Sequence, residues 1–137
     1  MVRSDRIEPE DSEGDAKARR DARPLIKPWP AIVERYEQSS SDQGSMQAML
    51  ALTRYIAGSD ISGRLHGWVS QFDLCIVDSE VTFPYLGPHL RVCPMPVNQI
   101  ELRYINPQDK DAQWHLGSDL GDVVPNFIAA LERLQWI

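Results

Sequence analysis

Apolar residues spaced three or four positions apart predict three helices in this chain. The first covers about residues 30–38 and the last about residues 122–135, and each carries one apolar stripe that can face a core. The middle helix covers residues 45–57, between an N-cap at Ser45 and a terminating Gly58. Because it is apolar almost all round, this helix is either buried inside the fold or paired with a second copy of the chain.

Polar and apolar residues alternate in four segments between the second and third helices, and a period of two predicts β-strands. Pro94 ends one of these strands, because proline cannot donate to a sheet ladder. Alternation with short connections favours an antiparallel sheet that has one face against the core and the other in solvent. The predicted strands are residues 70–77, 89–93, 99–105 and 112–116.

The order of these elements, α-α-β-β-β-β-α, belongs to the α+β class. We expect two N-terminal helices, a four-stranded and mainly antiparallel sheet and a C-terminal helix, with the helices packed on one sheet face. The length of 137 residues suits one domain, which we place at residues 24–137. Residues 1–23 carry six basic and seven acidic side chains and no aromatic one, so they are predicted to form a disordered tail.

Composition excludes several classes of protein. Fourteen Lys and Arg against twenty Asp and Glu give a net charge of −6, which argues against nucleic acid or an anionic membrane as the partner. Two cysteines do not make a disulfide scaffold, and no apolar run has the length of a signal-peptide core or a membrane span. The chain is therefore predicted to be cytoplasmic, with both thiols reduced, and to bind another protein, with a basic one as the first choice.

Motifs of catalysis and cofactor binding are missing from the sequence. It contains no glycine-rich phosphate loop, no HExxH, no GxSxG and no CxxC. We accordingly expect no cofactor and no catalytic machinery of the chain's own.

The strand alternation places the ionisable side chains on one surface of the sheet. Nearly every ionisable strand residue falls on the sheet face opposite the core, where neighbouring strands lie about 4.8 Å apart. A one-sided sheet must place its polar residues on its wet side, so a plain solvated surface is the simplest interpretation. The functional interpretation is a face that binds a partner protein. Its candidate residues are Asp73, Cys75, His89, Arg91, Cys93, Glu101, Arg103 and His115.

An alternative for the same face is a small-ligand site or an enzyme. Cys93 or Cys75 would then be a nucleophile activated by His89 or His115, with Arg91 helping to form the thiolate. A zinc site built from the two cysteines and the two histidines is less favoured. Its members His89 and Cys93 are separated by about 13 Å along one strand, too far to share an ion without a bend.

The connection before the second predicted strand is unusually apolar. Phe83 and Tyr85 lie there among prolines, which leave the loop little entropy to lose on binding. The loop is either a recognition element or a cap on the open end of the sheet. Together these features predict a small acidic protein-binding domain, with an immunity-like role or that of an accessory subunit.

Overall fold

The computed structural model describes residues 24–39 and 44–137. Within these residues, no helix is both long enough and apolar enough to cross a membrane. Three short 3-10 helices, η1 (Asp60–Gly63), η2 (Lys110–Ala112) and η3 (Leu120–Asp122), connect the larger elements. The helices and strands are α2 (Trp29–Ser39), α3 (Gly44–Ala57), β1 (His66–Ser70), β2 (Asp73–Val77), β3 (His89–Met95), β4 (Gln99–Ile105), β5 (Trp114–Asp119) and α4 (Val123–Arg133).

The chain falls into two compact units. The larger unit, Ile26–Glu80 with Leu86–Ile137, contains every helix and strand named above. The described part of the smaller unit is residues 24–25 and Val81–Tyr85, which are joined by a backbone hydrogen bond and an isolated β-bridge. The tail predicted at residues 1–23 lies outside the described residues.

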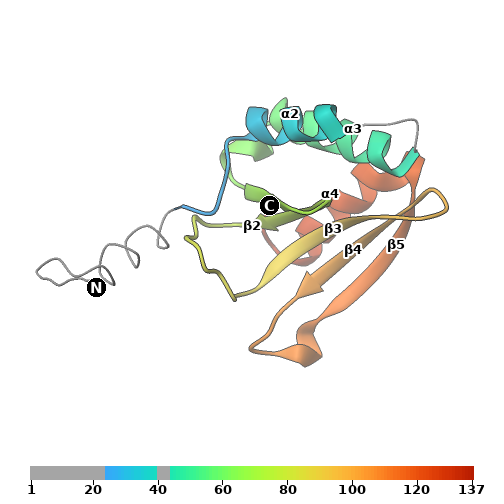
Figure 1. The fold of residues 1–137 in the computed structure, drawn as a ribbon. Coiled ribbons are helices and arrows are strands. Elements are labelled where there is room, and N and C mark those ends of the chain that lie inside the picture. Colours follow the sequence, from blue (N-terminus) through green and yellow to red (C-terminus); the bar gives the residue numbers. More distant parts are fainter. Residues whose placement is uncertain (1–23, 40–43) are drawn as a thin grey trace, which may run out of the picture. The chain divides into compact units, whose positions relative to one another are not determined.

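The sheet has five strands in the order β1-β2-β3-β4-β5, and each strand runs antiparallel to its neighbours. Helices α2 and α3 lie side by side over one face of the sheet, and α4 packs on β4 and β5 (Figure 1). The buried side chains of all three helices form one core with the inward residues of the strands. The α+β class is therefore confirmed, with five strands where the sequence predicted four.

The fifth strand arises from a turn that the sequence did not reveal. The predicted strand 70–77 is in fact a hairpin, because the chain reverses at Gln71 and Phe72. Gln71 adopts a φ of 59°, and Phe72 is 55% exposed at the turn. Residues 66–69, which lie outside the predicted strands, form β1 together with Ser70.

Two further strand boundaries also differ from the prediction. β3 continues through Pro94, which pairs with Ile100 on β4, instead of ending before it. A proline is tolerated here because the β2 pairing stops at Val92, so Pro94 has a strand on one side only, as at a sheet edge. β5 begins at Trp114, two residues later than predicted, because η2 occupies the preceding residues.

The apolar middle helix, α3, is accounted for by the core of its own chain. Met49, Leu52 and Ile56 are fully buried, and the hydroxyl of buried Thr53 donates to the carbonyl of Leu50 at 3.0 Å. Burial inside the fold thus explains the pattern without a second copy.

Candidate protein-binding face

The face of the sheet opposite the helices, called here the outer face, is defined by the strand register. Cys75 on β2 pairs with Arg91 on β3, Arg91 pairs with Arg103 on β4, and Arg103 pairs with His115 on β5. A second row lies one pleat along the strands, where Cys93 pairs with Glu101. All eight strand residues singled out from the sequence share this face: Asp73, Cys75, His89, Arg91, Cys93, Glu101, Arg103 and His115.

Arg91 and Arg103 bring two positive charges into a direct cross-strand pair, which is unfavourable unless each is compensated. Arg91 Nε donates to Asp73 Oδ2 at 2.8 Å, and the two side chains are 28% and 26% exposed. Arg103 Nε donates to Glu101, whose other oxygen lies 3.5 Å from His115 Nδ1. Each guanidinium is thus held at one nitrogen by a carboxylate. Within residues 24–39 and 44–137, neither guanidinium makes another hydrogen bond.

These carboxylates also raise the pKa of both guanidiniums. Burial alone would lower the pKa of Arg91, but the hydrogen bond and charge of Asp73 outweigh it and the pKa is raised. The hydrogen bond from Arg103 to Glu101 raises the pKa of Arg103. The centre of the face therefore carries two fixed positive charges and two fixed negative charges.

The two cysteines are free, and they are more buried than the alternation predicted. Cys75 is 0% exposed and Cys93 is 3% exposed. Burial raises the pKa of Cys75 to about 11 and that of Cys93 to about 12. Both are therefore neutral thiols at physiological pH, the opposite of what a cysteine nucleophile requires.

One ring nitrogen of His89 faces a backbone carbonyl. Its Nδ1 lies 3.1 Å from the carbonyl oxygen of Gly87, and its ring centroid is 6.0 Å from that of Trp68. Burial lowers the pKa of His89, and the nearby charge of Arg91 lowers it further. Over the described part of the chain, no group of three or more His, Cys, Asp or Glu side chains is arranged to hold a metal ion.

Phe83 and Tyr85 belong to the smaller unit, so the register of the sheet does not include them. Phe83 is 43% exposed, Tyr85 is half-buried, and the peptide bond between Phe83 and Pro84 is cis.

Sequence reasoning did not predict β1 as a strand. Trp68 pairs with Cys75, and Ser70 pairs with Asp73, so both extend the face by one strand. The segment His66–Ser70 has adjacent apolar residues, Trp68 and Val69, in place of a polar–apolar alternation, and the turn after it has none of the glycine, asparagine or proline that marks a hairpin.

The outer face thus presents hydrogen-bond donors fixed on a rigid sheet, without a reactive thiol and without a metal cluster among the described residues. Such an arrangement can hold the surface of another molecule. Comparison with known proteins finds no matching family, no matching curated protein and no matching solved structure.

Proposed function

We propose that this protein is a non-catalytic, cytoplasmic binding domain that holds a partner protein on its outer face. The observation that carries the proposal is the pair Arg91 and Arg103, side by side on β3 and β4 and each fixed at Nε by its own carboxylate. A guanidinium held in this way loses little entropy when its remaining N–H groups meet acceptors. Arginine is also among the residues that contribute most to binding energy in protein interfaces.

The chemistry of this pair specifies the groups that touch it. Nη atoms donate and cannot accept, so the partner supplies carboxylate or backbone carbonyl oxygens at this position. At longer range the net charge of −6 favours a partner that is basic overall, because opposite charges steer the encounter. Acidic contact groups within a basic protein meet both requirements.

A cytoplasmic setting is supported by the cysteines. Both are unpaired and buried, as expected for a protein that never needs a disulfide.

The experiment begins by capturing binding proteins from an extract of the native host on immobilised protein. A captured protein is then purified and titrated calorimetrically against the wild type, Arg103→Gln and Arg54→Gln. Arg103 is 43% exposed, and its replacement leaves the bond between Arg91 and Asp73 in place. Arg54 is the matched control, since it also pairs with a carboxylate, Glu37 at 2.8 Å, but from helix α3.

We expect Arg103→Gln to weaken the affinity by about tenfold, the effect of losing one charged hydrogen bond. Arg54→Gln should leave it unchanged, and raising the salt concentration should weaken binding of the wild type. A captured protein that binds both variants as well as the wild type would contradict the proposal.

A further inference from the structure

Two hairpin turns at the same end of the sheet expose apolar side chains. Phe72, in the turn between β1 and β2, is 55% exposed, and Val97, in the turn between β3 and β4, is 90% exposed. Both turns also place non-glycine residues at positive φ: Gln71 at 59°, Val97 at 64° and Asn98 at 55°. Left-handed backbone favours glycine and asparagine, and a β-branched residue there is strained. Val97 stays exposed, so burial does not offset its backbone strain. This points to a contact with another molecule.

Contacts with the helices hold both turns in place. The hydroxyl of Tyr36 on α2 donates to the carbonyl of Phe72 at 2.8 Å, and Arg35 donates to the carbonyl of Gln71 at 3.3 Å. Burial raises the pKa of Tyr36, so its hydroxyl keeps the proton that it donates. Asn98 packs against the start of α3, since a Cβ placed on Gly44 would lie only 2.9 Å from its Oδ1. The exposed side chains therefore project from fixed backbone.

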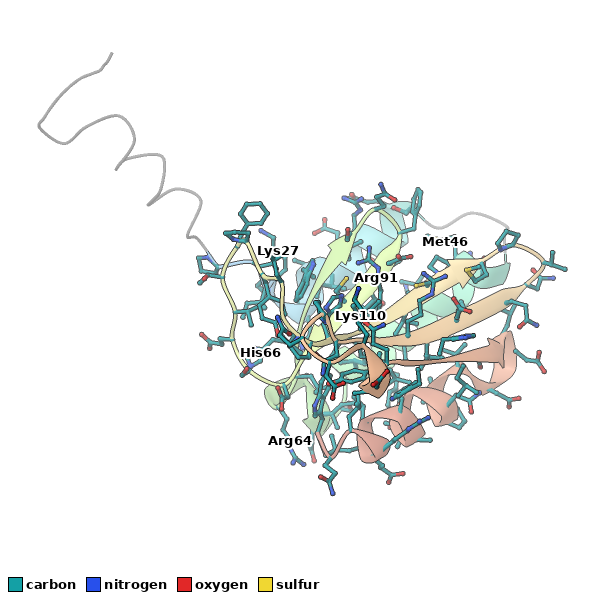
Figure 2. The ribbon with its side chains drawn as sticks, turned by 90° about the horizontal axis from the view of Figure 1, so that it is seen from below. Lys27, Met46, Arg64, His66, Arg91 and Lys110 are labelled. Carbon is teal, nitrogen blue, oxygen red and sulfur yellow. The ribbon has the colours of Figure 1, made fainter. Side chains whose placement is uncertain are left out.

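A groove of about 700 Å³ lies between the two turns. Met46, at the start of α3, forms part of its wall, and Figure 2 shows this residue near the end of the β3–β4 hairpin. No charged side chain is among its described lining residues. The name tip groove is used here for its apolar part, formed by Met46, Phe72, Pro94, Met95, Pro96 and Val97.

We propose that the tip groove binds a short segment of a partner protein that carries one or two bulky apolar side chains between basic flanks. The volume is of the size that receives side chains or small ligands. The lining residues that the structure describes are uncharged and favour an uncharged group at their point of contact. At long range the net charge of the whole chain, −6, favours basic residues on either side of that group.

A second copy of the chain fits the groove less well than a short segment does. Full burial of Phe72 and Val97 would cover on the order of 200 Å². A stable interface needs about 800 Å² on each partner. An anionic membrane is also disfavoured, because no lysine or arginine is among the described residues that line the groove and the chain is acidic.

The inference shares with the proposed function the premises that the occupant is a protein and that the net charge of −6 favours basic groups on it. It uses none of the outer-face residues, and its test involves neither Arg91 nor Arg103. Either surface can therefore fail while the other stands.

The test starts from a random peptide library displayed on phage, selected on the immobilised wild-type protein. Enriched sequences are synthesised and titrated against the wild type, Val97→Asn, Phe72→Ser and Leu86→Ser. Val97→Asn suits the turn better than valine does, so its folded state is retained and a loss of binding cannot be ascribed to unfolding. Leu86→Ser is the matched control, because Leu86 is 77% exposed but precedes β3 at the opposite end of the sheet.

We expect the enriched peptides to contain a bulky apolar residue flanked by lysine or arginine. Their affinity should fall by about tenfold or more in Val97→Asn and Phe72→Ser and stay unchanged in Leu86→Ser. Amide NMR signals of Phe72, Val97 and Asn98 should shift on titration.

Several results would overturn the proposal. One is a library that yields no enriched sequence, and another is enriched peptides that bind Val97→Asn as well as the wild type. A wild-type protein that sediments as a dimer where Val97→Asn is monomeric would assign the groove to a second copy. Phe72-dependent binding to phospholipid vesicles would assign it to a membrane.

Discussion

Arg91 and Arg103 lie directly opposite each other on β3 and β4, and each forms an ion pair with a different carboxylate. Asp73 reaches Arg91 from the neighbouring strand β2, whereas Glu101 reaches Arg103 from its own strand. The compensation of like charges is therefore local, and it fixes two guanidiniums at the centre of the outer face (Arg91 is labelled in Figure 2).

Asp73→Asn should destabilise the fold, because it leaves Arg91 beside Arg103 without its carboxylate. We expect a loss of about 1 kcal/mol at low salt and a smaller loss at high salt, since the pair is only partly buried. A double-mutant cycle measures the coupling energy between Asp73 and Arg91. It compares urea unfolding of Asp73→Asn, of Arg91→Gln and of the double variant.

The matched cycle uses Glu37→Gln with Arg54→Gln, a pair whose side chains are 46% and 57% exposed. Its coupling should be smaller, at most about 0.5 kcal/mol. A coupling between Asp73 and Arg91 no larger than this would show that partial burial does not strengthen the pair.

The cysteines should resist alkylation in the folded state. With pKa values of about 11 and about 12, both thiols are almost entirely protonated at pH 8, and both are buried. Iodoacetamide labelling followed by mass spectrometry should modify neither thiol before the protein unfolds, and both in denaturant. Rapid labelling of Cys75 or Cys93 in the native state at neutral pH would instead restore the nucleophile hypothesis.

The same pKa values predict a loss of stability at alkaline pH. In the unfolded chain a thiol ionises near its ordinary value of 9.0, whereas the folded chain keeps it neutral up to about 11. The unfolded state then binds fewer protons, so the free energy of unfolding falls as the pH rises above about 9. In the double variant Cys75→Ala/Cys93→Ala, the free energy of unfolding should depend less on pH between pH 9 and 12.

Val97→Asn should raise the free energy of unfolding by about 1 kcal/mol, because asparagine tolerates the left-handed conformation that strains valine. Thermal unfolding measures the gain. Leu86→Asn replaces another exposed apolar residue at an ordinary φ and should not stabilise the protein. An unchanged or lowered melting temperature for Val97→Asn would mean that the turn carries no such strain.

Gly67→Ala should destabilise the junction between α2 and β1. A Cβ at this position would lie 3.0 Å from Trp29 Cη2 and 3.1 Å from the carbonyl oxygen of Cys75, and the backbone oxygen cannot move aside cheaply. We expect a loss of about 1–3 kcal/mol. The control is Gly117→Ala on β5, where the nearest atom would be 3.8 Å away and no comparable loss should follow. Equal effects of the two substitutions would contradict the close approach of Trp29.

The long periodic elements could be predicted from the sequence. The middle helix and β4 were placed to within one residue, because α3 has a continuous apolar pattern and β4 has an unbroken alternation. The same alternation assigned all eight candidate strand residues to one face, since a strand fixes its faces by parity alone.

Tertiary context decided the rest. The turn at Gln71 and Phe72 has no sequence signal, and contacts from α2 to the carbonyls of both residues are what hold it. The alternation of residues along each strand placed Cys75 and Cys93 on the solvated face. It could not show that both would be buried there. The ion pairs of the outer face depend equally on the register between strands, which no single segment encodes.

The central claim is that Arg91 and Arg103 form the contact with a partner protein. Its most direct test is the NMR spectrum of the arginine Nε–Hε groups, recorded for the free protein and for its complex with a captured and purified partner. We expect the Nε signals of Arg91 and Arg103 to shift or broaden on binding while that of Arg54 stays in place. A complex in which the signals of Arg91 and Arg103 remain unchanged would contradict it.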